Sequence, residues 1–224
     1  MTALQNLLAG YRDAAATPRE AGMYFEELTL AYFRNEPKFH ELYREVLPFA
    51  DWAGKRGLDK RDTGIDLVAE TFANESHAIQ CKLYEPDYRL QKADIDSFFT
   101  ASGKTQFTGR IIVSTTNHWT EHAEEALRDQ QPPVTKIDLA ELEKSVIDWS
   151  GYAPRQPPVL KQKKELRPHQ RAALNKVIAG LATHDRGKLI MACGTGKTFT
   201  SLKIAEELAG EGKRVLFLVP SLAL

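Results

Sequence analysis

The chain has 224 residues with 30 basic and 30 acidic side chains, so its formal net charge is zero. Hydrophobic residues make up 42% and charged residues 27%, which is typical of a globular chain with at least one sizeable core. Because no apolar run of about 18 residues is present, and no basic segment with an apolar one after it at the N-terminus, we expect a cytoplasmic protein without a membrane span. The charge is uneven: residues 1–150 have a balance of −8 (17 basic, 25 acidic), and residues 151–224 have a balance of +8 (13 basic, 5 acidic).

Hydrophobic periodicity predicts an α/β domain in residues 1–150. A helix is expected over residues 20–34, and a helical pattern continues over residues 37–48. Strand-like and helix-like segments alternate after this point, which is typical of a layered α/β fold. The expected strands cover residues 64–72, 78–84, 110–114 and 134–137, and the expected helices cover residues 92–102, 120–128 and 139–149.

Prolines and basic residues are concentrated in residues 151–168, where four prolines occur. Proline favours extended chain and removes a backbone donor, so this stretch is predicted to be a linker. We therefore expect a first domain over residues 1–150 and the start of a second domain over residues 169–224.

A glycine-rich sequence, Ala-Cys-Gly-Thr-Gly-Lys-Thr, occupies residues 192–198. An expected strand (189–192) precedes it, an expected helix (197–209) follows it, and a second strand is expected over residues 214–219. Backbone amides of such a loop bind nucleotide phosphates, while its lysine reaches the β and γ oxygens and its last threonine binds Mg²⁺. The expected nucleotide-binding residues of the loop are Gly194, Thr195, Gly196, Lys197 and Thr198. The acidic and arginine residues that hydrolysis requires do not follow, so we expect weak nucleotide binding and no ATP turnover from this chain.

A second polar group lies in the two expected strands at 64–72 and 78–84. If these strands form an antiparallel hairpin centred at Asn74, Asp66 lies opposite Lys82, and Gln80 shares a face with Lys82. Asp66 and Gln80 offer oxygen ligands suited to Mg²⁺, and Lys82 is suited to orient a water and stabilise charge on a phosphate. The alternative interpretation is an exposed hairpin face whose polar residues only meet water.

These residues also resemble a known family. Gly64-Ile65-Asp66, with Ile79-Gln80-Cys81-Lys82 after it, resembles the core of the PD-(D/E)xK nucleases, most closely the Mrr-like restriction endonucleases, in which glutamine replaces the middle acid. Gly22 to Glu26 resembles the opening helix of that group, whose glutamate contributes to the metal site; Glu27 is the alternative position. The resemblance covers residues 20–150. It implies a restriction-endonuclease-like fold, Mg²⁺ as cofactor and double-stranded DNA as partner. The implied catalytic residues are Asp66, Gln80, Lys82 and Glu26, of which Asp66, Gln80 and Glu26 would hold the metal.

Residues 164–224 resemble the beginning of a superfamily 2 helicase. Leu166 to Gln170 is similar to the Q motif, in which the glutamine contacts adenine, so Gln170 is the matching residue. Residues 192–198 are similar to motif I and residues 215–224 to the start of motif Ia. This resemblance implies ATP as cofactor and a RecA-like P-loop domain that is incomplete here.

A Mrr-like nuclease placed before a helicase motor resembles the N-terminal part of ATP-dependent restriction enzymes, most closely the single-polypeptide type I (type ISP) restriction-modification group. This resemblance implies a Mg²⁺-dependent endonuclease that hydrolyses DNA phosphodiester bonds when the full-length protein translocates. Further helicase regions, and methyltransferase and target-recognition regions, would follow in that polypeptide. Two alternatives stay open: a nuclease–helicase of DNA repair or phage defence without a methyltransferase, and a catalytically inactive DNA-binding or docking module.

Overall fold

The computed structural model describes residues 1–61, 64–103, 106–154, 156–162, 164–210 and 212–218, and the chain divides into two compact units. The first unit is Met1–Lys161 and the second is Gln162–Leu224. None of the described helices is both long enough and apolar enough to cross a membrane.

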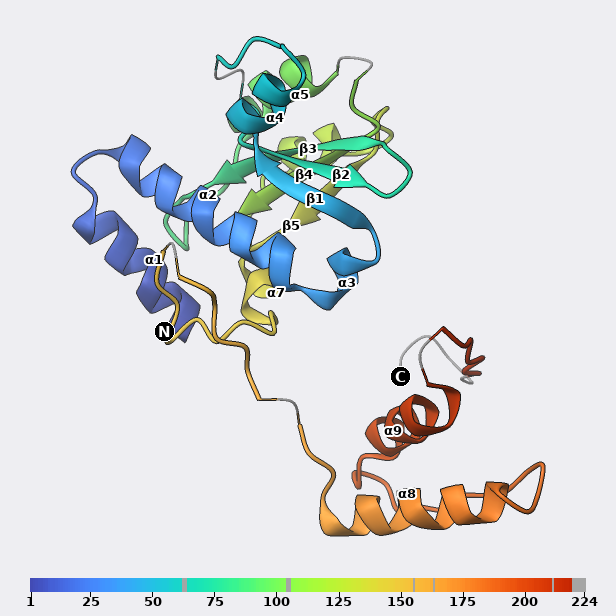
Figure 1. Cartoon of the computed structure of the whole chain (residues 1–224). Helices are drawn as coiled ribbons and strands as arrows, with labels where there is room; N and C mark the ends of the chain where they lie inside the picture. Colours follow the sequence, from blue (N-terminus) through green and yellow to red (C-terminus); the bar gives the residue numbers. More distant parts are fainter. Residues whose placement is uncertain (62–63, 104–105, 155, 163, 211, 219–224) are drawn as a thin grey trace. The chain divides into compact units, whose positions relative to one another are not determined.

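The first unit is built on a five-stranded sheet in the order β1-β2-β3-β4-β5 (Figure 1). Strand β2 is antiparallel to both β1 and β3, whereas β3, β4 and β5 run parallel to one another. The strands are β1 (Tyr43–Pro48), β2 (Leu67–Thr71), β3 (Ser76–Lys82), β4 (Gly109–Ser114) and β5 (Val134–Ile137). This mixed sheet confirms the predicted α/β class.

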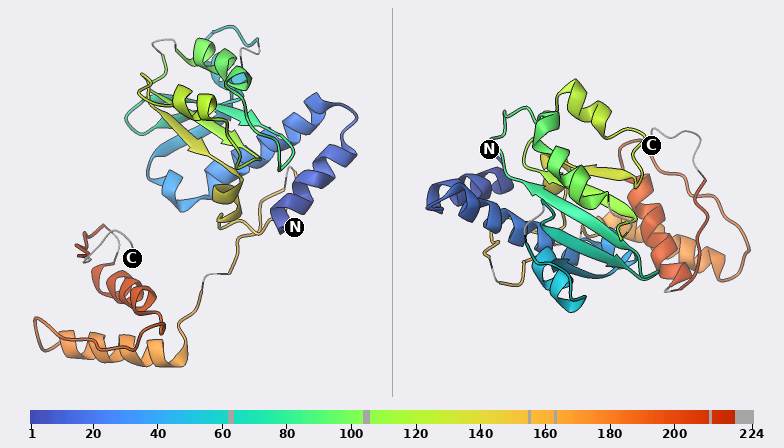
Figure 2. Two further views of the ribbon diagram at one scale, coloured as in Figure 1. Left: turned by 180° about the vertical axis from the view of Figure 1, so that it is seen from behind. Right: turned by 90° about the horizontal axis from the view of Figure 1, so that it is seen from above.

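Helices cover both faces of the sheet. One face packs on helices from the two ends of the unit, α1 (Ala3–Ala14), α2 (Pro18–Asn35), α3 (Pro37–His40) and α7 (Leu139–Glu143). The other face packs on α4 (Phe49–Lys55), α5 (Asp96–Ser102), which follows the short 3-10 helix η1 (Lys92–Asp94), and α6 (Glu121–Ala126). Figure 1 shows α2 across the front of the sheet with α1 beside α2, and the left view of Figure 2 shows the first unit from behind.

The two sides of each central strand supply two separate apolar cores. Leu67 and Ile79 belong to the core under α1 and α2, and Val68 and Ala78 belong to the core under α4 and α5. This alternation is what a strand buried on both faces requires. Burial on both faces explains why the sequences of β2 and β3 are nearly continuous apolar runs.

The prediction of continued helix over residues 37–48 is wrong beyond His40. Residues Tyr43–Pro48 form the edge strand β1, in which Val46 pairs with Ala69 of β2. Tyr43 and Val46 are both buried in the core, and aromatic and β-branched residues suit a half-buried pleated strand. Tertiary pairing therefore overrides the helical spacing of this segment.

The helix expected over residues 139–149 is shorter than predicted and ends at Glu143. The indole of Trp149 donates a hydrogen bond to the Leu142 carbonyl at 3.0 Å, which satisfies an acceptor left by the end of the helix. The chain then returns along the same unit, because Ile147 bridges to Leu160 and Tyr152 is buried in the core.

The second unit contains α8 (Pro168–Leu181) and α9 (Lys197–Ala209), which pack together around the buried residues Gln170, Leu174 and Thr200. Helix α9 has the bounds predicted from the sequence. The strands predicted at 189–192 and 214–219 do not form in the described residues, and Val219 lies outside them. A strand needs a ladder partner, and within the described part of this unit neither segment pairs with another. The side chains of Ile190, Leu216 and Leu218 are accordingly exposed.

Candidate active site

Asp66 immediately precedes β2, and Gln80 follows Ile79, the last residue of β3 that pairs with β2. Leu67 pairs with Ile79, and the amide of Asp66 donates to the Ile79 carbonyl at 2.9 Å. The prediction that Asp66 faces Lys82 is therefore wrong by two residues. The pairing of Leu67 with Ile79 places the midpoint of the hairpin at residue 73 instead of 74. When the midpoint moves by one residue, the residue paired with any given position moves by two. Because two positions are one full strand period, Gln80 and Lys82 keep their predicted common face.

The carboxylate of Asp66 is turned toward β3. The backbone amide of Cys81 donates to Asp66 Oδ2 at 2.6 Å, and the amide of Phe49 donates to the Asp66 carbonyl at 2.8 Å. The first contact fixes the side chain, and the second fixes its backbone to the start of α4. Asp66 therefore has a defined orientation before any ligand binds.

Gln80 is buried, with an exposed fraction of 3%. Its Nε2 donates to the Gly64 carbonyl at 3.0 Å, whereas its Oε1 is buried and accepts no hydrogen bond from the described residues. Buried acceptors without a partner are uncommon and call for an explanation. The alternative of a solvent-exposed polar face is wrong for Gln80. A neutral amide oxygen from Gln80 and a carboxylate from Asp66 are both ligand types that a hard divalent cation prefers, so the donor types agree with a Mg²⁺ site.

The charges of Glu26, Asp66 and Lys82 all act on Cys81. Burial raises the pKa of the Cys81 thiol well above its usual value, the charges of Asp66 and Glu26 raise it further, and Thr29 and Lys82 lower it. Glu26 of α2 therefore lies close enough to Cys81 of β3 for its charge to act on the thiol. Within the described residues, no three His, Cys, Asp or Glu side chains form a metal-holding group. A metal here would therefore depend on the Gln80 amide as well as on carboxylates.

Glu27, the alternative to Glu26, acts on a different cluster. Burial raises the pKa of Tyr152 to about 12 and also raises that of Tyr11, and the charge of Glu27 adds to both shifts. The Tyr152 hydroxyl donates to the Glu27 carbonyl at 3.4 Å. The charge of Glu27 thus acts on Tyr11 and Tyr152, whereas the charge of Glu26 acts on Cys81 of β3.

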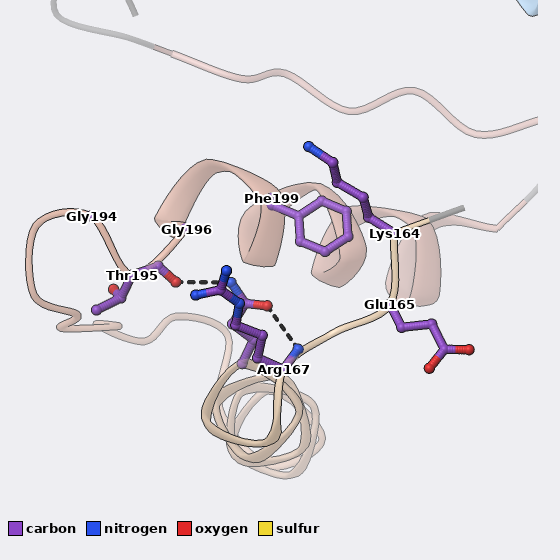
Figure 3. A pocket seen from close by; sticks show the side chains of 8 residues that line it. Lys164, Glu165, Arg167, Gly194, Thr195, Gly196 and Phe199 are labelled. Carbon is purple, nitrogen blue, oxygen red and sulfur yellow. Dashed lines mark hydrogen bonds between the residues drawn. The ribbon is translucent and has the colours of Figure 1, made fainter. Parts of the chain in front are cut away.

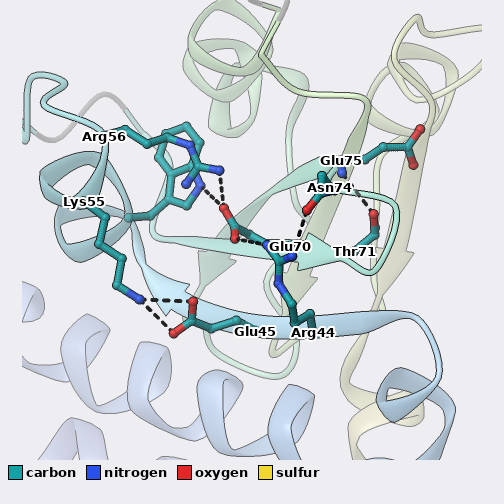
Figure 4. A network of polar contacts seen from close by, with 9 residues as sticks. Arg44, Glu45, Lys55, Arg56, Glu70, Thr71, Asn74 and Glu75 are labelled. Atoms are coloured by element: carbon teal, nitrogen blue, oxygen red, sulfur yellow. Dashed lines mark hydrogen bonds and ion pairs between the residues drawn. The ribbon is translucent and has the colours of Figure 1, made fainter.

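The strand that follows Asp66 is held by a buried carboxylate, Glu70 (Figure 4). Trp52 Nε1 donates to Glu70 Oε1 at 2.9 Å, Arg44 Nη2 lies 3.0 Å from Oε2, and Arg56 forms an ion pair with Oε1. Burial alone would raise the pKa of Glu70, but the two guanidinium groups and the indole lower it below its usual value. This network ties β1, β2 and α4 together near the turn end of β2. The sequence pattern did not predict it.

Two glycines of the glycine-rich loop in the second unit have positive φ values. Gly194 and Gly196 have φ values of +76° and +82°, a region in which glycine is favoured. Lys197 Nζ donates to the Ala192 carbonyl at 3.3 Å, so this lysine lies over its own loop. Helix α9 begins at Lys197 without a side-chain cap, and its first amides are available to an anion.

Gln170 joins α8 to this loop, beside a pocket of about 420 Å³ (Figure 3). Its Nε2 donates to the Thr195 carbonyl at 2.8 Å, and its Oε1 accepts from the Arg167 amide at 2.9 Å. The pocket is lined by Lys164, Glu165, Arg167, Gln170, Gly194, Thr195, Gly196 and Phe199. The structure thus brings Gln170 to Gly194, Thr195 and Gly196, while Lys197 and Thr198 are exposed at the start of α9.

Comparisons with known proteins agree with this architecture. The restriction endonuclease family matches residues 34–159, and the family described as "Type III restriction enzyme, res subunit" matches residues 163–224. The chain is 38% identical over 89 residues to the type I restriction enzyme EcoAI endonuclease subunit of Escherichia coli, a match that covers 35% of this chain and 11% of that protein.

A solved structure is also similar. The chain matches the ATP-dependent type ISP restriction-modification enzyme LlaBIII bound to DNA, with a TM-score of 0.70 and 35% identity. The match covers 94% of this chain and 13% of that one. The chain therefore spans little more than a tenth of the length of either relative.

The layered sheet with its hairpin site, joined to a P-loop segment, defines a nuclease domain followed by the start of a helicase-like segment. The chain belongs to the restriction endonuclease family, and its relatives are type I and type ISP restriction enzymes. The predicted fold and the predicted resemblance are confirmed.

Proposed function

We propose that the N-terminal domain, predicted over residues 1–150, is a Mg²⁺-dependent endonuclease that hydrolyses phosphodiester bonds of double-stranded DNA. The observation that carries the proposal is the buried Gln80 Oε1, which accepts no hydrogen bond from the described residues, next in sequence to Cys81, whose amide donates to the Asp66 carboxylate. The similarity to a type ISP enzyme bound to DNA supports duplex DNA as the partner.

Each residue of the site has a role that follows from its chemistry. A bound divalent cation supplies charge stabilisation at the phosphate and makes a water more acidic. Asp66 and Gln80 would hold that cation with one carboxylate and one neutral oxygen, and Glu26 would assist from α2. Lys82 would orient the attacking water, and its ammonium charge would offset the charge that develops on the phosphate.

ATP is the second cofactor in the proposal. The amides of Gly194, Thr195 and Gly196 would bind its phosphates, with Lys197 exchanging its contact with the Ala192 carbonyl for a phosphate oxygen and Thr198 binding Mg²⁺. Gln170 would contact the adenine. The parent polypeptide would add the remaining helicase regions, with methyltransferase and target-recognition regions, and would act in the cytoplasm. Its similarity to an ATP-dependent restriction-modification enzyme supports this arrangement.

The test is cleavage of supercoiled plasmid by the full-length parent with Mg²⁺ and ATP. Asp66→Ala and Lys82→Ala should reduce cleavage by about 100-fold or more and leave ATP hydrolysis intact, since each removes a group that acts in the transition state. Lys197→Ala should abolish ATP hydrolysis and, with it, cleavage. An Asp66→Ala enzyme that cuts at the wild-type rate would remove the assignment and favour a DNA-binding or docking role for this domain.

A further inference from the structure

The orientation of the Gln80 carboxamide is set by one backbone group. Its Nε2 donates to the Gly64 carbonyl at 3.0 Å, so Oε1 is directed away from that contact. The hydrogen bond distinguishes the two ends of the amide, because only the nitrogen can donate to a carbonyl. Gly64 therefore determines which atom of Gln80 is left for a ligand.

Gly64 reaches this position through an unusual backbone conformation. Its φ is +88°, in the region that glycine adopts readily and most other residues avoid. A Cβ at this position would lie 3.4 Å from Ser97 Oγ and 3.6 Å from Gln80 Nε2, which are ordinary contact distances. Backbone conformation, and not lack of space, is therefore what a side chain at residue 64 would disturb.

We propose that Gly64 is a positioning residue for metal binding: its left-handed backbone presents a carbonyl that anchors Gln80 Nε2 and leaves Gln80 Oε1 as the metal ligand. The inference rests on the proposed function, because it takes Gln80 to be a ligand. It also gives a reason for a glutamine at this position. A carboxylate has no hydrogen to donate to the Gly64 carbonyl, whereas an amide serves both the carbonyl and the cation.

The experiment compares Mn²⁺ affinity, by titration calorimetry, for the 224-residue chain and three variants. Gly64→Ala should weaken binding by about 10–100-fold, the usual effect of removing a group that orients a metal ligand. Gly64→Asn should retain most of the affinity, because asparagine tolerates positive φ better than alanine does and the position has room. Gly57→Ala is the matched control: Gly57 has φ of +67°, and an added Cβ would meet nothing within 4 Å.

A second readout needs no metal. In the metal-free chain, the side-chain NH₂ signals of Gln80 should show a hydrogen-bonded proton that Gly64→Ala removes and Gly57→Ala leaves in place. Wild-type Mn²⁺ affinity in Gly64→Ala, or an equal loss in Gly57→Ala, would overturn the inference and leave the proposed function standing. A wild-type chain that binds no Mn²⁺ would instead contradict the proposed function, and the inference with it.

Discussion

Replacing Glu70 with glutamine should destabilise the first unit more than any exposed carboxylate does. Glu70 contacts Trp52 Nε1, Arg44 and Arg56 from the interior of the sheet (Figure 4). Glutamine can still accept from the indole, but it removes the negative charge that the two guanidinium groups share. The change therefore leaves their positive charges without a counterion.

The size of the effect depends on how well water replaces Glu70. Removing one partner of a fully buried ion pair costs about 3–5 kcal/mol. Here the side chains of Arg44 and Arg56 are 48% and 39% exposed, so solvent compensates for part of the loss. We expect Glu70→Gln to lower the free energy of unfolding by about 1–3 kcal/mol.

Urea denaturation of the 224-residue chain measures this loss, and Glu45→Gln is the matched control on the neighbouring strand. Glu45 pairs with Lys55 at 2.8 Å, but the two side chains are 40% and 55% exposed, so its loss should cost about 0–1 kcal/mol. Equal losses for the two variants would refute the reasoning.

The same comparison has a defined pH dependence. Because the pKa of Glu70 is lowered in the folded chain, its charge stabilises the fold above the pKa of an unfolded glutamate, about 4.3. That stabilisation is lost as pH falls through the lowered folded pKa. The difference between wild type and Glu70→Gln should therefore be constant near neutral pH and shrink under acidic conditions. A difference that grows on acidification would contradict the assignment of the charge to Glu70.

Two further predictions concern glycines that other side chains approach closely. Gly109→Ala would place a Cβ 2.7 Å from a ring carbon of His77 and should cost about 1–3 kcal/mol in urea unfolding. The exposed Gly10 of α1 is its control, since Gly10→Ala should stabilise the helix by about 0.5–1 kcal/mol; equal signs for the two variants would count against the packing argument. Gly196→Ala would collide with Gln170 Nε2 at a backbone φ of +82°, and should weaken binding of a fluorescent ATP analogue without unfolding α9. Unchanged nucleotide binding would show that this contact is dispensable.

The sequence predicted best those elements whose pattern is strong and local. Strand β5 and helix α9 have the predicted bounds, and α2 includes the predicted residues 20–34. Tyr43–Pro48 was predicted as helix because apolar spacing in so short a segment fits either structure. Its pairing with β2, which depends on residues 19 to 28 positions away, decides the outcome.

The hairpin was predicted in its two strands but not in its register. Local sequence does not fix the centre of a short turn, and in this turn the amide of Thr71 donates to the Glu75 carbonyl while Asn74 adopts a φ of +63°. The burial of Gln80 and the role of the Gly64 carbonyl depend on how neighbouring segments pack. In the local sequence, the glycine at position 64, two residues before Asp66, was the feature that could have indicated an unusual backbone conformation beside Gln80.

The predicted strands of the second unit show a different limit. Residues 189–192 have a suitable apolar composition, but composition cannot supply the neighbouring strand that a ladder requires. The glycine-rich loop and α9 depend on local backbone conformation, so they form without that partner.

The metal site can be tested directly with a crystal of the 224-residue chain soaked in millimolar Mn²⁺. We expect an anomalous peak between the Asp66 carboxylate and Gln80 Oε1, and its loss in Asp66→Ala crystals. A wild-type crystal with no peak at that position would contradict the claim that these two side chains form the metal site of a nuclease.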